Sequence, residues 1–82
     1  MKIKGVIEYT DEIFLYLRKR RILRQYNKVV KKLIAGQEKS LKIRQPKNER
    51  IYYFRINKQY RAYGKMKEGY LVVFAIDNHQ NG

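Results

Sequence analysis

The apolar positions are most regular in the middle of the chain, where residues 22–34 follow a helical period. Apolar side chains recur there at i, i+3, i+4 and i+7: Ile22, Leu23, Tyr26, Val29, Val30, Leu33 and Ile34. The opposite side of this segment carries only basic and amide residues. Gly36 follows at the position where a left-handed glycine commonly ends a helix. The pattern predicts an amphipathic helix with one face in the core.

A shorter helix is predicted before it. Thr10 is a suitable N-cap, and the two acids that follow it, at positions 11 and 12, suit the positive end of the helix dipole. The apolar stripe of this helix consists of Ile13, Phe14 and Leu17. The basic run at residues 18–21 predicts a tight turn between the helices. Because no glycine or proline marks this turn, one continuous helix is the alternative prediction. Upstream, the alternation from Lys2 to Tyr9 predicts a short strand.

From residue 50 onward the period changes to two, which is typical of strands. Tyr52, Phe54 and Ile56 alternate with Tyr53, Arg55 and Asn57. Further strands are predicted at residues 60–65 and 70–77, with turns at 57–59 and 67–69, and such short connections favour an antiparallel meander. The apolar run at 71–76 predicts a central strand covered on both faces. We expect one core that buries both Leu33 and Phe74.

The element order β-α-α-β-β-β predicts an α+β fold, a small antiparallel sheet with a two-helix hairpin on one face. The other face is expected to be open and basic. The polar segment at residues 37–49, which contains Pro46, is predicted to be a loop with room for a short extended piece at 41–44. A chain of 82 residues is long enough for one domain only, so residues 1–82 are expected to form a single unit.

The charge distribution points to a polyanionic partner. The net charge is +13, and residues 18–67 hold eighteen basic and two acidic side chains. A surface of this sign favours nucleic acid over a membrane as the partner. No apolar run approaches 18 residues and no charged segment precedes an apolar one, so we expect neither a membrane span nor a signal peptide, and a cytoplasmic location.

The composition excludes several kinds of site. The chain has no cysteine, which excludes a disulfide scaffold and cysteine-ligated zinc or iron–sulfur centres. A single histidine, His79, makes a metal site unexpected, and no cofactor is expected. The sequence also lacks a glycine-rich phosphate loop, a Ser/His/Asp set and a closely spaced carboxylate pair. Histidine is the side-chain type that titrates near neutral pH, so His79 is the best acid–base candidate.

Four segments carry a family resemblance. Lys42-Ile43-Arg44, Tyr53-Phe54-Arg55 and Tyr60-Arg61 occur in this order, and Phe74-Ala75-Ile76-Asp77-Asn78-His79-Gln80 follows near the end of the chain. Together with the size and the element order, they resemble the RelE/ParE superfamily of bacterial and archaeal toxins over nearly the whole chain.

The resemblance implies a function. RelE-like toxins cleave messenger RNA in the ribosomal A site without a metal, by attack of a ribose 2′-hydroxyl on the adjacent phosphate, and so inhibit translation. ParE-like relatives share the fold but act on DNA gyrase. Both are held silent by an antitoxin, which we expect here to be a helical, acidic protein.

The resemblance also assigns roles to residues of this chain. Arg61 matches the arginine that stabilises the phosphate, and Arg55 is a second candidate for that contact. Lysines that some members use as the general base align with Ile51 and Tyr53, so acid–base catalysis falls to His79. The further RNA-binding candidates are Lys42, Arg44 and Lys47 for the backbone, and Tyr53 and Tyr63 for stacking on bases.

Three functions therefore stay open. The leading one is an endoribonuclease toxin that acts on ribosome-bound message. The second is a non-enzymatic, ParE-like inhibitor of gyrase. The third is an RNA-binding or ribosome-associated protein without catalytic activity.

Overall fold

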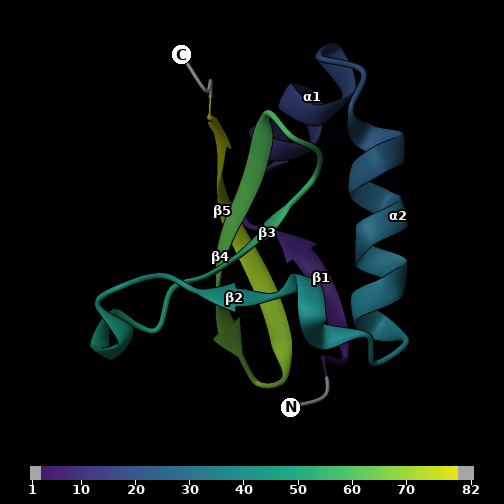
Figure 1. Cartoon of the computed structure of the whole chain (residues 1–82). Helices are drawn as coiled ribbons and strands as arrows, with labels where there is room; N and C mark the ends of the chain where they lie inside the picture. The colour runs from purple at the N-terminus through teal and green to yellow at the C-terminus, as the bar shows by residue number, and fades with distance from the viewer. Residues whose placement is uncertain (1–2, 80–82) are drawn as a thin grey trace.

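A computed structural model of the chain describes residues 3–79 (Figure 1). The elements, in chain order, are β1 (Gly5–Glu8), α1 (Asp11–Lys19), α2 (Leu23–Ile34), the 3-10 turn η1 (Glu38–Ser40), β2 (Lys42–Ile43), the 3-10 turn η2 (Lys47–Glu49), β3 (Tyr52–Arg55), β4 (Tyr60–Lys67) and β5 (Tyr70–Asn78). The predicted α+β class and element order are confirmed. The extended piece expected within residues 41–44 forms the short strand β2.

The five strands form one sheet in the order β1-β5-β4-β3-β2. Strands β3, β4 and β5 pair antiparallel, as predicted, and the short β2 also pairs antiparallel with β3. Strand β1 runs parallel to β5, so the sheet is mixed and the all-antiparallel prediction is wrong for this strand. The chain leaves β1 through two helices rather than a hairpin, so no tight turn fixes its direction. Its position is held by backbone hydrogen bonds from the N–H groups of Lys4 and Tyr9 to the carbonyls of Gly69 and Val73, both 2.8 Å.

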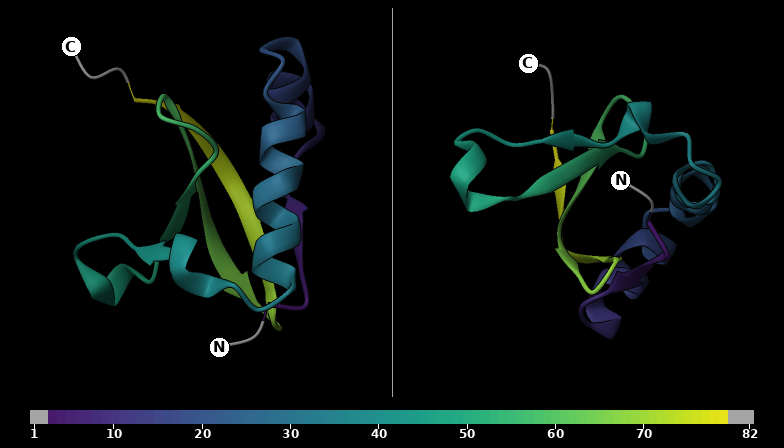
Figure 2. Two further views of the ribbon diagram at one scale, coloured as in Figure 1. Left: turned by 45° about the vertical axis from the view of Figure 1, so that its right-hand side comes forward. Right: turned by 90° about the horizontal axis from the view of Figure 1, so that it is seen from below.

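Both helices lie on the same side of the sheet (Figure 2). The break between them is real: α1 ends at Lys19, and Arg21 takes a left-handed conformation with φ of 59° although it is not a glycine. Gly36 ends α2 as predicted, with φ of 93°. The Gly36 N–H donates to the Leu33 carbonyl at 3.1 Å and the Gln37 N–H to the Lys32 carbonyl at 2.9 Å, which closes the helix end.

The core lies between the helices and one face of the sheet. It joins α1, α2 and the strands through Ile3, Ile13, Leu17, Ile22, Tyr26, Leu33, Phe54, Ile56, Ala62, Leu71 and Val73. Leu33 is fully buried, as expected, but Phe74 is 39% exposed and Phe14 is 38% exposed. Strand β5 is therefore not covered on both faces, because the helices cover only one. We call the opposite, uncovered face of the sheet the open face.

Leu33→Ala is expected to lower the free energy of unfolding by about 2–5 kcal/mol, because the substitution leaves a cavity in a closely packed core. Ile34 is the matched control, since it is the next residue of the same helix and is 41% exposed. Ile34→Ala should change the unfolding free energy by less than about 1 kcal/mol. Urea denaturation of both variants measures the difference, and equal losses would contradict this placement of the core.

A hydrogen bond ties β1 to α2. The phenol of Tyr26, which is 2% exposed, donates to Oε2 of Glu8 at 2.8 Å. Burial, the hydrogen bond to Glu8 and the negative charge of Glu8 together raise the pKa of Tyr26 well above its ordinary value. The neutral phenol is therefore the form that the folded protein favours.

Tyr26→Phe is expected to destabilise the protein by about 1–3 kcal/mol at pH 7, because the partly buried Glu8 carboxylate loses its donor. Since the pKa is raised on folding, the stabilisation by Tyr26 is complete below about pH 10, where unfolded tyrosine begins to ionise, and it falls as the pH rises further. Urea unfolding at pH 7 and pH 11 should show that the difference between wild type and Tyr26→Phe shrinks at pH 11. A difference that is the same at both pH values would contradict this role of the phenol.

Candidate nucleic-acid interface

Side chains on the open face are arranged in rows that cross the strands. In one row, Tyr53 of β3 pairs with Tyr63 of β4, and Lys42 of β2 lies opposite Tyr53 on its other side. In the next row, Arg61 of β4 pairs with Arg55 of β3. Because side chains alternate between faces along a strand, these residues share the face that the helices leave uncovered. Tyr60, the neighbour of Arg61, faces the other way and meets the ring of Tyr16 on α1.

Four of these side chains form a contact chain that we call the Arg–Tyr cluster: Arg44, Tyr53, Arg61 and Tyr63. The rings of Tyr53 and Tyr63 lie 5.5 Å apart between centroids, at an interplanar angle of 34°. The Arg61 guanidinium carbon lies 5.4 Å from the centroid of the Tyr53 ring. The Arg44 guanidinium carbon lies 5.6 Å from the centroid of the Tyr63 ring. The cluster therefore places two tyrosine rings side by side and one cation against each ring.

This arrangement suits a single-stranded nucleic acid. Tyrosine rings on a sheet surface stack on unpaired bases, and arginines beside them contact the phosphates between those bases. A guanidinium can hold two phosphoryl oxygens at once. All four members are partly or fully exposed, so no element of the protein must move before a ligand can contact them.

Asp77 of β5, which was not among the site residues predicted from the sequence, lies directly opposite Arg61. The row Arg55, Arg61, Asp77 thus combines two cations with one carboxylate. The pairing depends on a bulge next to Tyr63 and Gly64. Without the extra residue in β5, the hairpin would place Ile76 opposite Arg61. Alternation along the strands predicts which face of the sheet each residue occupies, but the bulge determines which residues of β4 and β5 lie opposite each other.

His79 lies just past the end of β5. Its backbone N–H donates to the Gln59 carbonyl at 2.6 Å, which extends the pairing of β4 and β5 by one residue. His79 is exposed, and strand alternation assigns it to the same face as Asp77. The side chain of His79 is therefore expected one same-face position beyond Asp77, the residue opposite Arg61.

The structure brings together some of the eight predicted site residues but not all of them. Arg61, Tyr53, Tyr63 and Arg44 follow one another in a chain of contacts, and the sheet register sets Lys42 and Arg55 beside Tyr53 and Arg61. His79 is one step beyond the row of Arg61. Lys47 lies in η2, in the loop between β2 and β3 that extends away from the body of the protein (Figure 1).

A second basic surface lies on the exposed side of α2. Arg24, Asn27, Lys28 and Lys31 line a shallow depression there. None of these four is aromatic, so this surface offers charge without a platform for bases. Within residues 3–79, no three histidine or acidic side chains gather as a metal site requires. No helix in that same part of the chain is long and apolar enough to cross a membrane.

Comparisons of the chain with protein-family models, with curated proteins and with solved structures give no match.

Proposed function

We propose that this protein is a toxin of a toxin–antitoxin system, a metal-free endoribonuclease that cleaves ribosome-bound messenger RNA. The observation that carries the proposal is the Arg–Tyr cluster on the open face, where two adjacent tyrosine rings are each paired with an arginine. An exposed pair of rings between cations is suited to unstacked bases and their phosphates, which single-stranded message presents and duplex DNA does not.

The proposed reaction is transesterification within the RNA. The 2′-hydroxyl oxygen forms a bond to the adjacent phosphorus while the bond from phosphorus to the 5′-oxygen of the next nucleotide breaks. The products are a 2′,3′-cyclic phosphate and a free 5′-hydroxyl. One proton leaves the 2′-hydroxyl and one reaches the 5′-oxygen, so the step is balanced and consumes neither a proton nor water.

The residues of the Arg61 row fit this chemistry. Arg61 and Arg55 are paired across β3 and β4, so both guanidinium groups can approach the same phosphate, whose charge grows in the transition state. His79, one step further along β5, accepts or delivers a proton in the proposal. Tyr53 and Tyr63 hold the flanking bases, while Arg44 and Lys42 contact the backbone.

The proposal includes an acidic, helical antitoxin that neutralises this charge. A net charge of +13 favours rapid association with such a partner, because opposite charges steer the encounter. Inhibition of gyrase remains the alternative, since the same basic surface could contact a protein instead of RNA.

Purified protein incubated with translating ribosomes tests the proposal, with primer extension as the readout and a gyrase supercoiling assay in parallel. We expect cleavage within the message at the ribosomal A site and unchanged supercoiling. Intact message together with blocked supercoiling would replace the nuclease by the ParE-like alternative. Intact message, normal supercoiling and retained RNA binding would leave an RNA-binding protein without catalytic activity.

A further inference from the structure

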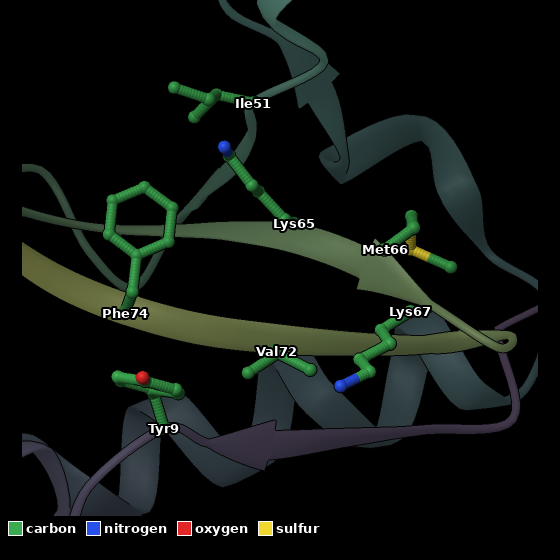
Figure 3. A pocket seen from close by; sticks show the side chains of 7 residues that line it. All are labelled: Tyr9, Ile51, Lys65, Met66, Lys67, Val72 and Phe74. Carbon is green, nitrogen blue, oxygen red and sulfur yellow. The ribbon is translucent and has the colours of Figure 1, made fainter.

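A groove of about 540 Å³ lies on the open face (Figure 3). It is lined by Tyr9, Ile51, Lys65, Met66, Lys67, Val72 and Phe74. Figure 3 shows Tyr9 and Phe74 at one end of the groove, Lys67 at the other, and Lys65 between them. The groove therefore combines exposed aromatic and aliphatic surface with two ammonium groups.

Strand β4 connects the groove to the cluster. Arg61, Tyr63, Lys65 and Lys67 alternate with the inward-facing Ala62 and Gly64, so the four lie on the open face in one line. From position 61 to position 67 this line spans about 20 Å at the usual rise of a strand. Its first half belongs to the cluster and its second half to the groove. Neither Lys65 nor Lys67 was among the site residues predicted from the sequence.

The bulge in β5 contributes the aromatic end of the groove. Tyr63 pairs with Ala75 but Gly64 pairs with Val73, so Phe74 is the unpaired extra residue. Phe74 is 39% exposed, and Tyr9, which follows the edge strand β1, is 72% exposed. Large aromatic side chains that remain exposed beside cations are suited to stacking on a ligand.

We infer that single-stranded RNA continues beyond the Arg–Tyr cluster along β4, with Lys65 and Lys67 on its phosphates and an unpaired base in the groove against Phe74 and Tyr9. The inference rests on the proposed function and extends it, because it assigns a second binding site to the substrate strand. Two features favour RNA as the occupant: the line of cations and rings along β4 is continuous, and the groove has two lysines in its lining but no acid. Glu8, the acid nearest in sequence to Tyr9, is engaged with Tyr26 of α2.

RNA probes of two lengths distinguish binding in the groove from binding at the Arg–Tyr cluster. The probes are a dinucleotide and a hexanucleotide of single-stranded RNA, methylated at each 2′-hydroxyl so that cleavage cannot occur, and binding is measured by NMR titration. The double variant Lys65→Ala/Lys67→Ala should bind the dinucleotide like wild type and the hexanucleotide about tenfold or more weakly. For the hexanucleotide, the slope of the logarithm of the binding constant against the logarithm of the salt concentration should become less steep by about 1.4. Each phosphate contact to a single strand contributes about 0.7 to this slope, and the double variant removes two contacts.

The matched control is Lys28→Ala/Lys31→Ala, which removes the same charge from the exposed side of α2 and should leave the binding of both probes close to wild type. Phe74→Ala should weaken hexanucleotide binding by about 5- to 150-fold, as loss of one stacked base does. If the groove variants bind the hexanucleotide like wild type while Arg61→Ala weakens both probes, the inference is wrong and the proposed function stands. If wild type binds neither probe, the proposed function fails as well. A larger loss of hexanucleotide affinity in the α2 control than in the groove variant would contradict the inference and place the RNA on α2.

Discussion

Arg61→Ala is expected to lower cleavage of ribosome-bound message by about 10²-fold or more. Arg61 lies on the open face beside Tyr53 and is paired with Arg55 across the sheet. In the proposed reaction it meets a phosphoryl group whose negative charge increases toward the transition state, and removal of one such donor typically costs about 2.7–4 kcal/mol. The loss should appear in the rate of the chemical step more than in RNA affinity.

Two comparisons make this expectation specific. Arg61→Lys should recover only part of the activity, because an ammonium group cannot hold two oxygens in the planar geometry of a guanidinium. Arg24→Ala, which removes an exposed arginine from α2, should leave cleavage unchanged. Urea denaturation should show that Arg61→Ala is folded, since Arg61 lies outside the core. Full activity in Arg61→Ala would contradict the assignment of this residue.

His79→Ala is expected to lower the cleavage rate by about 10²–10⁴-fold, the usual contribution of a positioned acid or base. The dependence of the rate on pH should also change, because the variant lacks the side chain that moves a proton in the proposed reaction. Single-turnover cleavage measured from pH 5.5 to pH 8.5 gives both quantities.

The histidine test has its own control. His79→Gln keeps a polar side chain of similar size and should be as impaired as His79→Ala if proton transfer is the function. A variant that keeps the wild-type rate and pH profile would remove His79 from the catalytic set. In that case Asp77, which lies opposite Arg61, becomes the group to replace next.

The helical part of the fold could be predicted from the sequence because its signals are local. The apolar stripe of residues 22–34 and the glycine at 36 define α2 and its end, and both are found, except that Ile34 at the end of the stripe is exposed. The meander was also readable, since alternation and short turns locate β3, β4 and β5 within a few residues. The same alternation assigned Arg55 and Tyr53 to the face opposite Tyr52 and Phe54.

The rest depends on contacts between distant residues. The parallel pairing of β1 with β5 joins segments that no hairpin connects, so the sequence carried no local signal for its direction. The run at residues 71–76 is typical of a strand buried on both sides, yet within residues 3–79 the two helices cover only one face of the sheet. Phe74 is therefore left at the surface, in the groove rather than in the core.

The residue types of the candidate site were predicted from the sequence, but the contacts between these residues were not. Its cations and tyrosines were identified from their residue types and from the family resemblance, and strand alternation put several of them on one face. Which of them touch is set by the register of β2, β3, β4 and β5. A single inserted residue in β5 places Asp77 rather than Ile76 opposite Arg61, and no residue pattern announced that bulge.

The central claim is that single-stranded RNA binds the open face of the sheet, and NMR chemical-shift mapping tests it most directly. The isotope-labelled protein is titrated with the methylated hexanucleotide, and the shift of each backbone amide is recorded. The account predicts the largest shifts in β3 and β4, at residues 52–55 and 60–67, and small shifts in α2. Shifts concentrated at residues 24–31 of α2, with β3 and β4 unchanged, would contradict it.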